Sequence, residues 1–133
     1  MTKLERAVKR VKTPEDKMRR LVHGLLVDIA DDRTGYTSAL MEGLAIVLPK
    51  DKYDPQLLKW AESKIVEIVC SSLEGASAAD PRLRGIVHLL MLTFDGVALR
   101  VKALRAFDQT DAAMIDVENV LVEMLLDCRR TAA

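Results

Sequence analysis

The chain has 133 residues, which suffice for one domain and are too few for two ordinary ones. Half of the residues are apolar and 30% are charged, a composition that is typical of a soluble globular protein and excludes a disordered one. The formal net charge is zero, but residues 1–20 hold eight Lys and Arg against three Asp and Glu, which leaves about +5 on this segment and about −5 on the rest.

Helix-start signals divide the chain into six predicted helices. The first is a short basic helix, which we interpret as a solvated face or an attachment end and not as a nucleic-acid-binding surface. In Thr13-Pro14-Glu15-Asp16 an N-cap threonine precedes a proline and two acids of a first turn. Asp54-Pro55 and Asp80-Pro81 repeat this pattern, and Thr110-Asp111 is a fourth start. We predict an all-α domain over residues 1–133, with helices at 3–11, 14–31, 36–48, 55–74, 81–105 and 111–129.

The helices before residue 75 each carry one apolar stripe, whereas the predicted helix 81–105 is apolar on two faces. Its first seam consists of Leu83, Val87, Leu90, Phe94, Val97 and Val101. A second seam with the same 4-3-4-3-4 spacing consists of Gly85, Leu89, Leu92, Gly96, Leu99 and Ala103. A helix that is apolar on two faces must be covered on two sides, and glycines suit a close approach of helices.

The predicted last helix also has an apolar arc wider than one face, which includes Leu121 and Leu125. Two adjacent helices of this kind predict a homodimer in which the last two helices of each copy form a four-helix bundle. The interface is then predicted to contain Gly85, Leu89, Leu92, Gly96, Leu99, Leu121 and Leu125. The alternative is that the earlier helices of the same chain cover the second seam from within.

The order of these elements is familiar. Asp80-Pro81-Arg82-Leu83 begins a long helix that contains the run Leu92 to Leu99. A short loop and a last amphipathic helix follow it. The segment from Thr13 to Met18 leads into the first full helix. From Thr13 to Arg130 the chain resembles the C-terminal, ligand-binding and dimerising domain of TetR-family (tetracycline-repressor-like) transcriptional regulators. The resemblance implies that the last two helices pair across a two-fold axis and that the preceding helices enclose an effector pocket.

The sequence departs from that family at its beginning. The family's DNA-binding region is an N-terminal three-helix unit, and this chain starts at what would be the connecting helix, Thr2–Val11. We therefore expect no direct DNA contact by this chain, and DNA contact only through the missing region. Either the chain is a fragment of a regulator, or it is a natural protein without the DNA-reading part.

No pattern of residues predicts an enzyme or a cofactor. His88 and Asp95 are seven residues apart, which is two helical turns or about 10 Å, too far for a direct acid–base pair. We expect each histidine to have a local partner instead. The spacings of zinc and di-iron sites are absent from the sequence, and the segment starting at Asp108 lacks the glycine and the final acid of a calcium loop.

An effector pocket in such a bundle is expected to be apolar with a few polar groups. The candidate ligand-binding residues lie on the inner helices: Met18, His23, Tyr36, Trp60, His88, Met91 and Asp95. The aliphatic composition and the methionines favour a small hydrophobic effector.

The cysteines and the hydropathy pattern suggest a compartment. Cys70 and Cys128 lie far apart within helical patterns and are predicted to be reduced thiols. Residues 1–20 lack the apolar core of a signal peptide, and the longest apolar stretch, at 86–101, is interrupted by His88, Asp95 and Arg100. We expect a cytoplasmic protein.

Two functional hypotheses follow. The first is an effector-binding and dimerisation domain of a TetR-like regulator. The second is a stand-alone helical interaction protein that dimerises, or that titrates a partner regulator, without binding DNA itself.

Overall fold

The computed structural model describes residues 3–29, 55–104 and 111–132, and every element in these ranges is a helix. The all-α prediction is therefore confirmed. In chain order the elements are α1 (Lys3–Arg10), α2 (Pro14–His23), the π-helical η1 (Gly24–Ile29), α4 (Pro55–Ser72), α5 (Pro81–Leu104) and α6 (Asp111–Ala132). The predicted helix at 36–48 lies outside the described residues.

The helix starts form as their residues predict. Thr13 has extended backbone angles, and its hydroxyl accepts a hydrogen bond of 3.1 Å from the backbone N–H of Asp16. Asp80 accepts one of 2.9 Å from the N–H of Arg82 at the start of α5. Each cap satisfies a backbone donor that the first turn leaves unpaired, so the two helices begin at defined residues.

The predicted helix 14–31 contains a change of winding that the sequence analysis did not predict. It is α-helical to His23 and continues as η1 from Gly24. Gly24 is buried, and a Cβ added there would lie 2.6 Å from Cδ1 of Leu4. The missing side chain thus allows α1 to pack closely against this helix.

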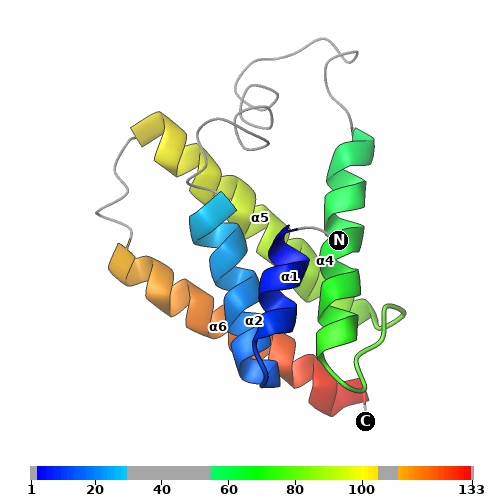
Figure 1. The fold of residues 1–133 in the computed structure, drawn as a ribbon. Coiled ribbons are helices and arrows are strands. Elements are labelled where there is room, and N and C mark those ends of the chain that lie inside the picture. Colours follow the sequence, from blue (N-terminus) through cyan, green and yellow to red (C-terminus); the bar gives the residue numbers. More distant parts are fainter. Residues whose placement is uncertain (1–2, 30–54, 105–110, 133) are drawn as a thin grey trace.

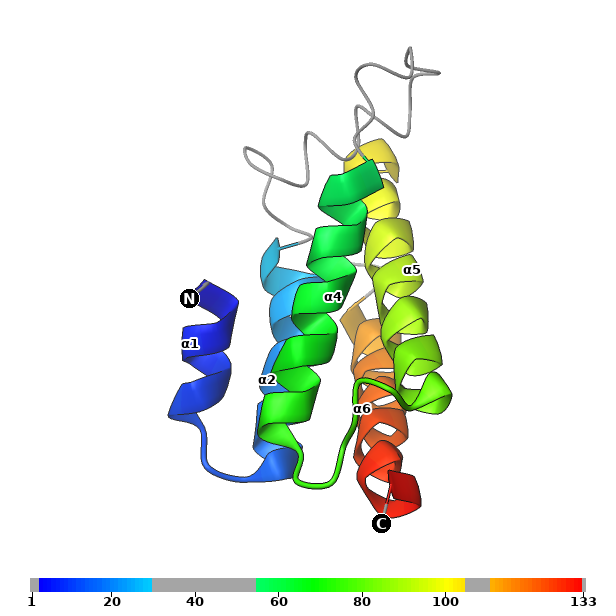
Figure 2. The same ribbon diagram turned by 90° about the vertical axis from the view of Figure 1, so that its right-hand side faces the viewer.

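The helices pack as a bundle (Figure 1), and the turned view shows α1 at one edge and α5 at the other (Figure 2). Helix α2 contacts α1, α4 and α6, and α5 contacts α4, η1 and α6. The chain therefore brings α6 against α2, although about 90 residues separate them in sequence.

The core is aliphatic and draws on every helix. Four of the six residues of the first seam of α5 are confirmed as part of it, since Leu83, Val87, Leu90 and Phe94 are at most 1% exposed. Val97 is partly buried against the core, and the side chain of Val101 lies outside the described residues. Other buried core residues include Val8, Met18, Leu21, Leu26, Ile68, Val69, Leu73, Val122 and Cys128. No helix in the described ranges is both long and apolar enough to cross a bilayer.

Candidate functional site

The second seam of α5 points away from the core. Leu89 is 41% exposed and Leu92 is 55% exposed. Gly85 and Gly96 are exposed too, and a Cβ added at either would meet no heavy atom of a neighbouring element within 4 Å. We call these four residues the outer face of α5. The predicted interface residue Leu99 belongs to the same seam, but its side chain lies outside the described residues.

The predicted interface is corrected at its two α6 positions. Leu121 is 3% exposed and Leu125 is fully buried, because this side of α6 packs into the core of its own chain. Among the described side chains of α6, the large apolar ones that are exposed are Ile115 and Val120. Val120 lies about 200° around the helix from Glu118, which contacts α2, so Val120 is turned away from α2.

The predicted ligand-binding residues do not form one site. Met18 and Met91 belong to the buried core, at 0% and 8% exposure, whereas Trp60 is 56% exposed on α4. Tyr36 lies outside the described residues. The two predicted histidines border two different hollows, His88 between α4 and α5 and His23 between α2 and α6.

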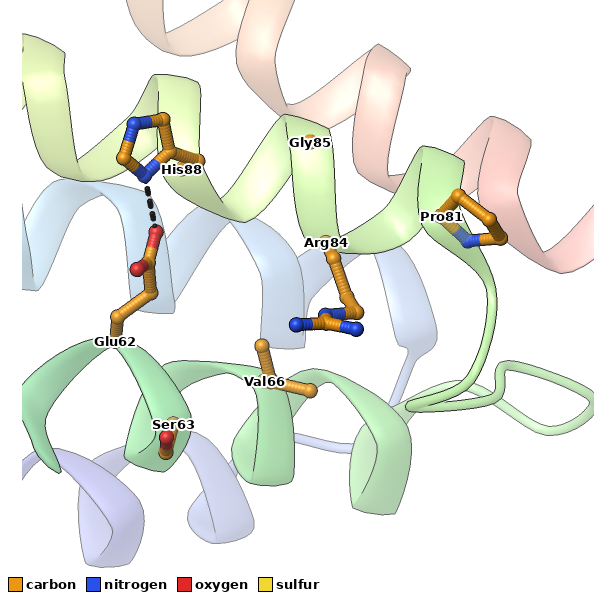
Figure 3. A pocket seen from close by; sticks show the side chains of 7 residues that line it. All are labelled: Glu62, Ser63, Val66, Pro81, Arg84, Gly85 and His88. Atoms are coloured by element: carbon orange, nitrogen blue, oxygen red, sulfur yellow. Dashed lines mark hydrogen bonds and ion pairs between the residues drawn. The ribbon is translucent and has the colours of Figure 1, made fainter. Parts of the chain in front are cut away.

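The α4–α5 hollow has a volume of about 440 Å³ and opens to the surface. Seven residues line it: Glu62, Ser63, Val66, Pro81, Arg84, Gly85 and His88 (Figure 3). Four of these residues are polar and three are not, so the hollow combines polar groups with apolar surface. Because Gly85 also belongs to the outer face of α5, the hollow adjoins that face.

The interior of the α4–α5 hollow has two levels. At the first, Nδ1 of His88 and Oε1 of Glu62 lie 2.6 Å apart across the two helices (Figure 3). At the second, one turn along each helix, Arg84 extends from α5 toward Val66 of α4 (Figure 3). Within the described part of the chain, no carboxylate lies within ion-pair distance of the Arg84 guanidinium.

Asp95, the seventh candidate, lies on α5 two turns beyond His88. Burial raises the pKa of its carboxyl, the negative charge of Glu62 raises it further, and His88 opposes the rise. The expectation of a local partner for His88 is thus met by Glu62 on the neighbouring helix, and Asp95 acts on the pair only electrostatically.

The second hollow, between α2 and α6, has a volume of about 330 Å³ and includes His23 and Glu118 in its lining. Glu118 is only 8% exposed, and its Oε1 lies 2.8 Å from Nδ1 of His23. Nearby, Arg19 donates a hydrogen bond of 2.7 Å to the side-chain oxygen of Asn119. These bonds join α2 to α6, so we assign them to the fold.

The chemistry of these groups favours binding. Among the described residues no three His, Cys, Asp or Glu side chains gather as metal ligands. Cys70 and Cys128 form no disulfide, and burial raises the pKa of both thiols, which disfavours the nucleophilic thiolate. A guanidinium without a partner beside a fixed imidazole is suited to holding an anionic group.

Comparisons with known protein families, with curated proteins and with solved structures give no match to this chain. The outer face of α5 and the α4–α5 hollow are therefore the features of this chain that bear on its function.

Proposed function

We propose that this chain is an effector-binding and dimerisation domain like that of TetR-family transcriptional regulators, and that two copies pair through the outer face of α5. The observation that carries the proposal is the exposure of Leu89 and Leu92 between two glycines. Val120 extends the contact onto α6, in place of the buried Leu121.

The energetics favour a covered outer face. Full burial of a leucine contributes about 1.5–3 kcal/mol, so covering the half of each side chain that is still exposed contributes about 1 kcal/mol per leucine. Gly85 and Gly96 each cost about 1 kcal/mol of helix stability relative to alanine. Because no other element of the described residues lies near Gly85 or Gly96, a second helix backbone approaching closely explains why both positions lack a side chain.

The effector half of the proposal is supported by the α4–α5 hollow. Its volume of about 440 Å³ lies within the range of small-molecule sites. Val66 and Pro81 offer apolar contacts to a small hydrophobic ligand, and the polar groups around them would orient it.

Sedimentation equilibrium at tens of micromolar tests the pairing. The wild-type chain should be a dimer, and Leu92→Asp should be a monomer with unchanged helical circular dichroism, because residue 92 is exposed within its own chain. Ile115→Asp is the matched control: Ile115 is 60% exposed, and it shares a face of α6 with Asn119, which contacts α2. This variant should remain a dimer.

A monomeric wild-type chain would refute the pairing, and so would equal dissociation of the two variants. The effector half is tested separately by thermal shift with a panel of small apolar compounds, since a ligand that binds only the folded state raises its melting temperature. The panel includes neutral compounds and organic acids, and no shift with any of them would refute that half.

A further inference from the structure

The level of Arg84 and Val66 in the α4–α5 hollow lacks a carboxylate. One turn away an acid on α4 does face a basic side chain on α5, since Oε1 of Glu62 lies 2.6 Å from Nδ1 of His88. Val66 is the α4 residue one turn after Glu62, and it places an apolar side chain opposite the guanidinium (Figure 3). Arg84 is therefore a cation that borders a hollow and has no anionic partner in the described chain.

We propose that the α4–α5 hollow binds a small organic carboxylate, whose carboxylate pairs with Arg84 and whose apolar body packs on Val66 and Pro81. The inference deepens the effector half of the proposed function and does not depend on the pairing of two copies. The planar guanidinium matches a carboxylate with two parallel N–H···O hydrogen bonds. A ligand of this kind supplies the group that position 66 of the chain lacks.

The neighbouring groups favour an organic anion over a cation or a bare inorganic ion. Oε1 of Glu62 lies 2.6 Å from Nδ1 of His88, one turn away from Arg84, so this carboxylate does not occupy the guanidinium (Figure 3). Val66 and Pro81 stabilise a ligand whose apolar part packs on them, and phosphate has no such part.

The test is a titration of the full chain with benzoate, followed by ¹H–¹⁵N NMR. Benzoate should move the amide signals of the residues lining the hollow and saturate at one site per chain. Benzamide, which keeps the ring and loses the charge, should bind about tenfold more weakly, in line with the strength of charge-assisted hydrogen bonds at an exposed site. Inorganic phosphate should also bind more weakly than benzoate.

The variants separate a specific site from general attraction. Arg84→Gln should weaken benzoate binding about tenfold, and Arg84→Lys should have an intermediate effect because it keeps the charge but loses the planar fork. Arg82→Gln is the matched control: Arg82 is an exposed arginine in the same turn of α5, and it does not line the hollow. Its affinity should equal that of the wild type. Melting curves confirm that each variant is folded.

Several results would overturn the inference: no saturable shift, equal affinity for benzoate and benzamide, tighter binding of phosphate, or equal loss in Arg82→Gln and Arg84→Gln. A neutral apolar compound that raises the melting temperature while benzoate does not bind would refute the carboxylate inference and leave the proposed effector function standing.

Discussion

Glu118 gives the sharpest test of how the helices pack. Its side chain is 11% exposed on α6, and a hydrogen bond of 2.8 Å joins its carboxylate to His23, which is 95 residues earlier at the end of α2. His23→Leu removes this partner and keeps a side chain of similar size. The carboxylate then remains buried beside an apolar group, which costs free energy unless water reaches it.

The size of the effect follows from the exposure of the pair. Breaking a fully buried pair costs about 3–5 kcal/mol. The His23 side chain is 42% exposed and borders the α2–α6 hollow, so water solvates part of the carboxylate in the variant. We therefore expect a loss of about 1–2 kcal/mol, or about 4–7 °C in melting temperature for a domain of this length.

Urea denaturation of a double-mutant cycle measures this interaction. His23→Leu and Glu118→Leu should each destabilise, and the double variant should lose less than the sum, with a coupling of about 1 kcal/mol. Asn119→Ala is the control, since its hydrogen bond to Arg19 also joins α2 to α6 but is exposed, and it should cost less than about 0.5 kcal/mol. A coupling near zero, or equal losses for His23→Leu and Asn119→Ala, would refute the described packing of α2 on α6.

Three further predictions concern single residues. Burial raises the pKa of Asp95 above its ordinary value of 3.8, so the folded state loses stability as the pH rises from that value through the raised pKa. Asp95→Asn should therefore melt at a higher temperature than the wild type at pH 7 but not at pH 3. An equal gain for Asp116→Asn, whose side chain is exposed, would contradict this explanation. Gly75 has a φ of +88°, a conformation that side chains disfavour, so Gly75→Ala should lower the free energy of unfolding by about 1 kcal/mol and the melting temperature by about 4 °C. An unchanged melting temperature would contradict the left-handed conformation at Gly75. At pH 7 a thiol reagent should label the partly exposed Cys70 slowly and the buried Cys128 only on unfolding, as measured by mass spectrometry. Prompt labelling of Cys128 in the folded chain would be inconsistent with its burial.

The helices were predictable because their start signals act locally. A cap such as Thr13 or Asp80 bonds to a backbone N–H two or three residues away, so the sequence contains both partners. The first seam of α5 was equally clear, since periodicity selects a buried face. The interface positions Leu121 and Leu125 were wrong because α6 is apolar over a wide arc. Periodicity defines such an arc but does not say which part of it faces the chain's own core.

The candidate site required contacts that no local pattern contains. His88 was identified from its own helix, where Asp95 was the nearest acid on the same face, but its partner Glu62 lies 26 residues earlier on α4. Which α4 residue faces His88 depends on how α4 and α5 are aligned along their axes, and a shift of one turn would put Val66 opposite His88 and Glu62 out of reach. The same alignment leaves Arg84 facing Val66 (Figure 3). Arg84 gains its functional interest from this mismatch, which exists only once the two helices are packed.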